Sequence, residues 1–339
     1  MRTGAELVRA SNPYAREDRG LTWRLLVVTY GLYAAAVALT LVDAVPLPVR
    51  LASSVLVGLT LVRMFIFYHD YLHGAILQKS PLGTAVMHLT GYLMLSAPSV
   101  WKETHDYHHK HTAKMVGAAI GSYPVVTVGM WKGMTPAQRT AYRLVRHPVN
   151  MLLGYFTVFL AGMCLSAFRR NPKTHADAAF AVVFHFGLAA LIGFTAGWTA
   201  ALLAVVLPGM MSTAAGSYLF YAQHNFPNMH IANRRDWEYS AAATRSSSFF
   251  DMNPVMHWFT GNIGYHHVHH LNHRIPFYRL PEAMREMPEL QSPGRTSWSP
   301  QDVLACLRLA IWDPGQGRML NWDEVESAAR SDADLMSAK

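Results

Sequence analysis

The stretch AAFAVVFHFGLAALIGFTAGWTAALLAVVLPGMMSTAAGSYLFYA, residues 178–222, contains no Asp, Glu, Lys or Arg. In a helix that rises about 1.5 Å per residue, it is roughly twice as long as the hydrocarbon core of a bilayer is thick. We therefore expect two membrane-spanning helices joined by a turn near Gly197 and Trp198. An uncharged stretch of this length indicates an integral membrane protein.

A second pair of apolar stretches lies closer to the N-terminus. Residues 25–42 have no charged side chain, and residues 51–68 are interrupted only by Arg63, with a proline-containing turn between the two stretches. Each is close to the roughly 20 residues that cross a bilayer, so the pattern predicts another helical hairpin. The composition agrees: 51% of the 339 residues are hydrophobic and only 15% are charged, where soluble domains have about 25% charged residues.

Two more apolar stretches, residues 81–100 and 149–168, are long enough to cross but stand alone between polar segments. If both crossed, the basic residues between positions 110 and 146 would be exported, against the positive-inside tendency. We therefore expect re-entrant or interfacial helices there. The predicted fold is an all-α integral membrane protein with four transmembrane helices in two hairpins, a cytoplasmic helical cap and both termini in the cytoplasm.

The formal charge of +8 is interpreted as setting this orientation, with a contribution from anionic lipid headgroups. A chain this apolar is not expected to bind nucleic acid. The two cysteines make no disulfide framework. We divide the chain into a membrane domain with its cap, residues 1–291, and a polar cytoplasmic tail, residues 292–339. In the tail, Ser299 and Pro300 begin an amphipathic helix expected to run to about Ile311.

Histidine is unusually frequent, with 18 residues, and most of them are clustered. The clusters are HDYLH at 69–73, HDYHH at 105–109, the single histidine of QHNF at 223–226, and HHVHH at 266–270. On a helix, residues three and four apart face the same way. The clusters supply two, three and three histidines in phase, and the isolated His224 makes nine: His69, His73, His105, His108, His109, His224, His266, His269 and His270.

Chance does not explain these clusters, because the pattern HxxHH should arise only about 0.05 times in a chain of this composition. In the four-crossing topology, every cluster lies on one face of the membrane and at one depth. Nine neutral imidazoles can fill most positions around two metal ions about 3.5 to 4 Å apart. Imidazole suits Fe, Zn, Cu and Ni, so the ligand type alone does not identify the metal. No cysteine lies in any cluster, which argues against structural zinc and iron–sulfur centres.

These motifs resemble those of the membrane fatty acid desaturases, in particular the bacterial acyl-lipid type. The segment WFTGNIGYHHVHHLNHRIP, residues 258–276, is similar to the third histidine box of that family almost throughout, and the resemblance extends over about residues 68–280. Two positions differ: Leu72 precedes His73 where glycine or threonine is common, and His273 stands where many relatives have proline.

The resemblance implies an O2-dependent fatty acyl desaturase of the bacterial inner membrane. It would carry two iron ions at a cytoplasmic di-iron centre, with the nine histidines as ligands. A fatty acyl lipid, acyl-CoA or acyl carrier would bring the substrate, and a separate ferredoxin, rubredoxin or cytochrome would supply two electrons. Asp70 and Asp106, each next to a box histidine, are expected to orient imidazoles, and Asn262 to hold a water ligand.

Other functions remain open at this point. A hydroxylase, a ketolase or a decarboxylase that forms terminal alkenes would share the scaffold and the first hydrogen abstraction. A membrane metal transporter or haem carrier is more distant, because transporters place their ligands at mid-membrane and a haem does not need nine histidines. The sequence leaves open the chain length, the double-bond position, the acyl carrier and the oligomeric state.

Overall fold

The computed structural model describes residues 1–115 and 120–327. Within these ranges, four helices are long and apolar enough to cross a membrane, as the sequence predicts. They are α2 (Arg19–Leu41), α3 (Leu47–Leu72), α10 (Ala176–Ala196) and the continuous helix Trp198–His224. The last comprises α11 (Trp198–Ala201), the π-helical turn η3 (Leu202–Val206) and α12 (Leu207–His224).

Local chemistry explains where these helices begin, end and deviate. The Asp18 side chain caps α2 by accepting a hydrogen bond from the Leu21 N–H. Gly197 ends α10 with φ of 91°, a conformation that favours glycine, so the predicted turn is confirmed. Pro208 lacks an N–H and cannot continue a regular ladder of hydrogen bonds, and the wider π turn of η3 comes directly before it.

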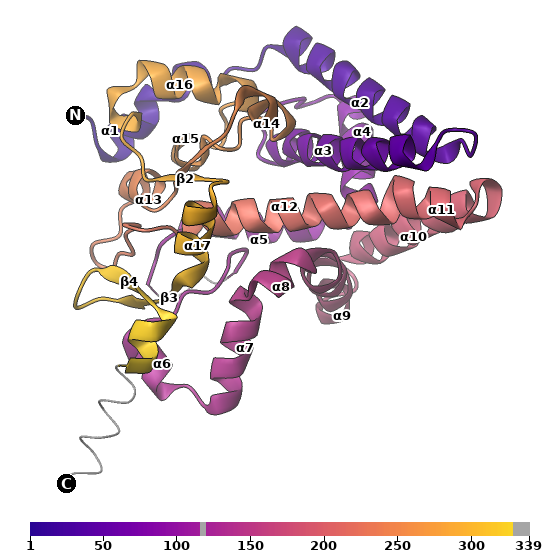
Figure 1. Ribbon diagram of the computed structural model, residues 1–339. Helices are drawn as coiled ribbons and strands as arrows, with labels where there is room; N and C mark the ends of the chain where they lie inside the picture. Colours follow the sequence, from indigo (N-terminus) through magenta and orange to yellow (C-terminus); the bar gives the residue numbers. More distant parts are fainter. Residues whose placement is uncertain (116–119, 328–339) are drawn as a thin grey trace.

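Helix α3 is at the centre of the membrane part, packed between α2 and α12 (Figure 1). Gly58 lies where α3 and α12 come closest, and a Cβ atom built there would be 3.3 Å from the Met211 Cβ and 3.4 Å from the Pro208 carbonyl oxygen. Most side chains in the second half of α3 are buried, so the end of this helix is held firmly. That end carries His69.

The two ambiguous stretches do not form long apolar helices. Residues 81–100 are divided between two helices, α4 (Pro81–Leu93) and α5 (Pro98–His111). Residues 149–168 fall in three consecutive helical elements, the middle one a long π-helix, and two other helices come before these three. These elements are α6 (Val128–Gly133), α7 (Pro136–Arg146), α8 (Pro148–Leu152), η2 (Tyr155–Ser166) and α9 (Ala167–Arg170).

The remaining helices gather at the end of α3 and α12 that carries the histidines, on the left in Figure 1. The N-terminal segment belongs to this cap, because α1 contacts α13 and the Arg2 guanidinium pairs with Glu289. The cap comprises α1 (Gly4–Ala10), η1 (Asn12–Tyr14), α13 (Tyr239–Arg245), α14 (Pro254–Phe259), α15 (His266–Leu271), η4 (Phe277–Arg279), α16 (Leu280–Glu286), η5 (Pro288–Leu290) and α17 (Pro300–Arg308).

The predicted helical fold is confirmed, and the cap also contains two small sheets. One is parallel and pairs β1 (Phe249–Asp251) with β2 (Arg295–Ser297); the other is antiparallel and pairs β3 (Leu309–Asp313) with β4 (Arg318–Asn321). Gly317, with φ of 63°, lies in the tight connection between β3 and β4. Strand β2 lies beyond residue 291, so the tail is paired directly with the body.

The tail helix begins as predicted but ends early. The Ser299 hydroxyl accepts a hydrogen bond from the Asp302 N–H, and Pro300 is the first helical residue. The helix stops at Arg308 instead of Ile311, because the next residues continue as the buried strand β3. Trp312 in that strand donates its backbone N–H to the Val126 carbonyl oxygen. The tail therefore packs on the body of the protein through Trp312 and Cys306.

Candidate metal centre

The nine histidines lie on four helix ends that meet beneath the cap. Helix α3 supplies His69 in its last turn and His73 as its C-cap, and α12 ends at His224. Helices α5 and α15 supply the two triplets, whose spacing puts all three imidazoles of each on one face. Each of the nine side chains is at most 9% exposed. The structure thus brings together every histidine that the sequence singles out.

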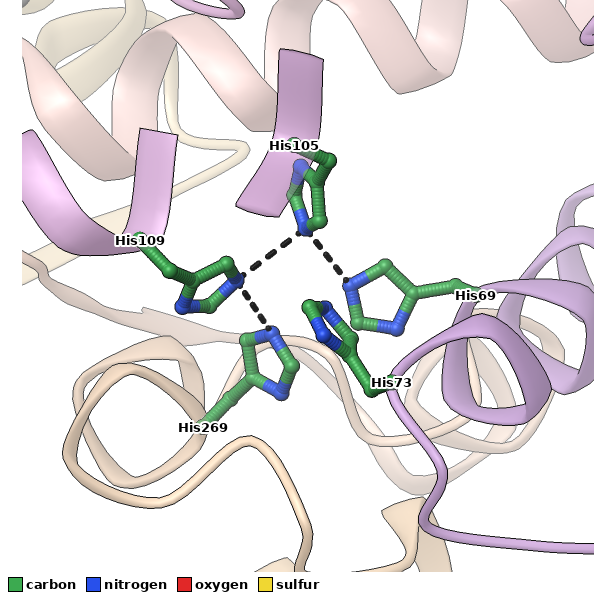
Figure 2. A group of neighbouring side chains, drawn as sticks. All are labelled: His69, His73, His105, His109 and His269. Carbon is green, nitrogen blue, oxygen red and sulfur yellow. Dashed lines mark hydrogen bonds between the residues drawn. The ribbon is translucent and has the colours of Figure 1, made fainter. Parts of the chain in front are cut away.

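The nine imidazoles divide into two groups, each able to hold a metal ion. The ligand atoms within each group lie within 4.8 Å of one another. The five-histidine group consists of His69, His73, His105, His109 and His269 (Figure 2), and the four-histidine group of His108, His224, His266 and His270.

In the five-histidine group, ring nitrogens of His69, His105, His109 and His269 point toward one another (Figure 2). In the five-histidine group, the Nε2 atom of His105 lies 3.2 Å from that of His69 and 3.1 Å from that of His109. In the four-histidine group, the Nε2 atom of His224 lies 3.1 Å from that of His108 and 2.9 Å from that of His266. Lone pairs converging in this way repel one another unless a proton or a cation lies between them.

The two groups are adjacent because α5 and α15 each contribute to both. In α5 the i, i+4 pair His105 and His109 belongs to the five-histidine group, while His108 belongs to the other. In α15 the arrangement is reversed: the i, i+4 pair joins the four-histidine group and His269 joins the five-histidine group. The rings of His109 and His270, one from each group, stack with centroids 4.3 Å apart. Each HxxHH motif therefore bridges two neighbouring metal positions.

Electrostatics favours the neutral imidazoles that metals require. Burial, and then the charge of neighbouring histidines, lowers the pKa of His105 and of His270 well below the usual range. His73 is buried, and neither of its ring nitrogens has a hydrogen-bond partner among the described residues. A buried imidazole without a partner is costly, and a metal ion in the five-histidine group would supply one. The donor set therefore fits two transition-metal ions.

Asp70 lies where the sequence predicts it to orient an imidazole. Its carboxylate is 3.0 Å from Nδ1 of His69, and its other oxygen accepts a hydrogen bond of 2.7 Å from the Phe277 N–H. The contact with Nδ1 leaves Nε2 of His69 to face Nε2 of His105. Asp70 is 1% exposed, so it also ties α3 to the loop that follows α15.

Asp106 and Asn262 make other contacts. Among the described residues, the Asp106 carboxylate accepts a hydrogen bond from Lys102, one turn earlier on α5, and none from a box histidine. Asp70 has the same adjacency to a histidine and does reach it, so packing around each helix, and not adjacency in sequence, decides which carboxylate contacts an imidazole. The Asn262 side-chain amide donates to the Phe277 carbonyl oxygen at 3.2 Å, so it holds the same loop as Asp70.

Three further histidines lie near the groups but belong to neither. His111 places Nδ1 at 2.9 Å from the Tyr107 carbonyl oxygen, and the buried His267 places Nε2 at 3.0 Å from that of Leu290. The His273 ring lies 4.7 Å from that of His73, between centroids, at the edge of the five-histidine group. Burial lowers the pKa of His273 to about 4.

Other side chains pack around the two groups, and one of them, Thr112, carries no recognisable signal in the sequence. Trp101 packs against His105 with ring centroids 4.1 Å apart and also contacts the Phe65 ring, so it covers the five-histidine group. On the other side, Thr112 places its hydroxyl 3.4 Å from Nδ1 of His270. A small, partly open cavity of about 40 Å³ reaches His108, His224 and Thr112. These contacts depend on packing between distant elements.

The fold and the site define a helical membrane protein with two adjacent all-histidine groups that can hold metal ions. A family model described as fatty acid desaturase matches residues 45–301, and the chain belongs to this family of oxidoreductases.

Three curated relatives agree. The fatty acid desaturase of Bacillus subtilis (strain 168) is 29% identical over 277 residues, which cover 81% of this chain and 78% of that protein. The sn-1 acyl-lipid omega-3 desaturases (ferredoxin) of Nostoc sp. (strain 36) and Synechocystis sp. (strain ATCC 27184 / PCC 6803 / Kazusa) are 24% and 23% identical. Each of these two alignments covers 65% of this chain and 62% of the relative, less than two thirds of its length.

Proposed function

We propose that the protein inserts a double bond into a fatty acyl chain with O2 and two external electrons, at a centre of two iron ions held by the nine histidines. The observation that carries the proposal is the pair of adjacent groups of five and four buried imidazoles at the ends of apolar helices. Family membership supports it. The names of two relatives specify an acyl-lipid substrate and ferredoxin.

The overall reaction balances as follows. The segment –CH2–CH2– of the acyl chain loses two hydrogen atoms and becomes –CH=CH–, while O2, two electrons and two protons complete the formation of two water molecules. The iron ions, when bound, supply the oxidising power that breaks an unactivated C–H bond. The chain itself contributes the ligands and the environment in which these ions work.

The described residues have distinct parts in this proposal. The nine imidazoles are neutral donors, so they stabilise the bound ions without adding charge. Asp70 keeps His69 in the tautomer that presents Nε2 to the ion, and its contact with Phe277 restricts rotation of the carboxylate. Trp101 and Phe65 form an apolar cover beside the five-histidine group and exclude water from it.

The proposed orientation places the histidines, the cap and both termini in the cytoplasm of a bacterium, with the four apolar helices in its inner membrane. The basic residues support this orientation, because those on the cap side include Arg234 and Arg235, whereas the two loops at the opposite end carry few charges. The electron donor is a separate protein of the ferredoxin, rubredoxin or cytochrome type.

The test is the fatty acyl profile of a host that expresses the chain, measured by gas chromatography with mass spectrometry. We expect a new unsaturated acyl chain with the intact protein and none with His108→Ala. His111→Ala is the matched control, since it removes a neighbouring histidine that belongs to neither group. Elemental analysis of the purified protein should give two irons per chain.

Other products would change the assignment. Hydroxylated chains or terminal alkenes would show a different outcome of the same hydrogen abstraction. A single haem, or exchangeable zinc in place of iron, would contradict the proposed centre.

A further inference from the structure

A basic surface lies directly outside the four-histidine group, and nothing in the proposed chemistry uses it. It consists of Lys110 and Lys114 at the end of α5 and of Arg234, Arg235 and Trp237 in the segment before α13; we call it the Trp237 face. The backbone joins these two segments, because Met115 donates its N–H to the Ala232 carbonyl oxygen at 3.0 Å and Ala232 donates to that of Ala113 at 3.1 Å.

The Trp237 face carries an excess of positive charge. Lys110, Arg234 and Arg235 are exposed, and the Lys114 ammonium lies 3.9 Å from the centroid of the Trp237 ring. Two acidic residues are nearby, Asp236 and Glu238. The Asp236 carboxylate accepts a hydrogen bond from the Asn233 amide, and that of Glu238 accepts from the first N–H groups of α13. The four basic side chains of this face therefore outnumber the two carboxylates, which are already engaged in local contacts.

Trp237 connects this face to the metal centre through two short contacts. Its indole Nε1–H donates to the Thr112 carbonyl oxygen at 2.8 Å. The hydroxyl of the same threonine lies 3.4 Å from Nδ1 of His270 and donates to the His108 carbonyl oxygen at 2.7 Å. Thr112 is buried and Trp237 is partly exposed. The route from the surface to a metal-binding imidazole thus consists of covalent bonds and two contacts of hydrogen-bond length.

We propose that the Trp237 face is the docking site of the electron donor, a small acidic iron–sulfur protein of the ferredoxin type, and that electrons enter through Trp237 and Thr112 to His270. This inference rests on the proposed function, because it supplies the two electrons which that reaction consumes. Basic side chains would steer an acidic carrier to this face. Electron transfer slows steeply with each gap through space, and this route has few gaps.

The redox step involves electrons only. At each encounter, the reduced [2Fe–2S] cluster of the carrier loses one electron and the metal centre gains it, with no bond formed or broken in the protein. Two encounters deliver the pair of electrons that one turnover needs. Trp237 shortens the distance that an electron must cross between the carrier and the metal centre. It is therefore a positioning residue, which orients the carrier and completes the electron route.

The first experiment measures docking without using the metal or the activity. Metal-free protein in nanodiscs of zwitterionic lipid is titrated with an oxidised plant-type [2Fe–2S] ferredoxin, the probe. We expect the double variant Arg234→Glu/Arg235→Glu to bind about tenfold more weakly at low salt, with the difference closing as salt screens the charges. The matched control, Arg169→Glu/Arg170→Glu, reverses two exposed arginines in α9 and should bind as the native chain does.

The second experiment measures the rate at which the reduced ferredoxin loses its electron to the iron-loaded protein without O2. Trp237→Leu should lower this rate about tenfold at saturating ferredoxin, whereas Trp237→Phe, which keeps the ring but loses the N–H, should have a smaller effect. Dithionite reduces the centre without docking, so its rate should be the same in all variants. Equal losses with ferredoxin and dithionite would mean that Trp237 only supports the fold, and would overturn the proposed route.

Two further outcomes would overturn the docking site. One is an equal loss of ferredoxin binding in the α9 control. The other is unchanged ferredoxin binding in Arg234→Glu/Arg235→Glu. If the same variant also bound more weakly to vesicles that contain phosphatidylglycerol, the face would be assigned to lipid headgroups. The titration uses metal-free protein, so it tests the docking site even if the protein has no reducible metal centre. A failure of the proposed function is therefore distinguishable from a failure of the docking site.

Discussion

At the scale of single residues, the contrast between Asp70 and Asp106 is the most informative. Both directly follow a box histidine in the sequence. The Asp70 carboxylate is buried and lies against Nδ1 of His69, while that of Asp106 pairs with Lys102 near the surface. The same local pattern therefore has two different roles, and the packing around α3 and α5 decides between them.

This contrast leads to a prediction. Asp70→Asn should weaken iron binding about 10- to 100-fold, because the carboxylate orients the imidazole and increases its basicity. Competition with a chelator measures the change. Asp106→Asn is the matched control and should retain the affinity of the native protein. Equal loss of iron in both variants would mean that Asp70 acts through general destabilisation.

At the scale of secondary-structure elements, the N-terminal helix α1 shows how the cap is held together. The Arg2 guanidinium donates two hydrogen bonds, of 2.8 and 2.9 Å, to the Glu289 carboxylate in η5. The hydrogen bond from Arg2 lowers the pKa of Glu289 from about 4.5 to about 2. A carboxylate with a depressed pKa stabilises the folded state above its ordinary pKa, and that contribution is lost as the pH falls toward the lower value.

We therefore predict that the docking of α1 is independent of pH from 7 down to about 4.5 and weakens between about 4.5 and 2. Hydrogen-exchange protection of the α1 amides, corrected for intrinsic exchange rates, measures this. Glu289→Gln should lower the protection at neutral pH and remove its dependence on pH in that range. If the pH dependence remained in the variant, another group would be responsible.

At the scale of the whole molecule, two of the four apolar helices, α3 and the helix Trp198–His224, end in box histidines that meet at the same end of the molecule. This arrangement predicts which loops face which side of the membrane. Ala44→Cys, in the loop between α2 and α3, should react with an impermeant maleimide on intact cells, and Ser292→Cys in the cap should react only after permeabilisation. Cys164 and Cys306 are buried, so the native chain is a suitable control. Labelling of Ser292→Cys on intact cells would contradict a cytoplasmic cap.

Metal binding should also stabilise the molecule as a whole. The two histidine groups join the ends of α3, α5, α12 and α15. Ions that bind the folded but not the unfolded chain raise its stability. We expect removal of iron by a chelator to lower the Tm by more than about 5 °C, and restored iron to reverse the change. The doubly substituted His73→Ala/His224→Ala protein should show a low Tm that no longer responds to iron.

Much of the fold and of the candidate site could be predicted from the sequence, because both depend on local repetition. Apolar stretches of membrane-spanning length with few or no charges mark the four apolar helices, and the spacing of three and four residues places each histidine triplet on one helix face. This spacing selects eight of the nine histidines, whereas His224 stands alone and is selected from the family resemblance and its place at the end of an apolar stretch. Gly197 could be placed at a turn because the uncharged stretch is twice the length of one crossing.

Other features depend on residues far apart in the chain, so only the tertiary structure decided them. The division into groups of five and four depends on how α5 meets α15, and His108 joins His224 although 116 residues separate them. The strands of the cap form because the tail folds back onto the body, which also ends α17 early. Helical periodicity determines which way a side chain points, whereas packing between distant segments determines what it meets.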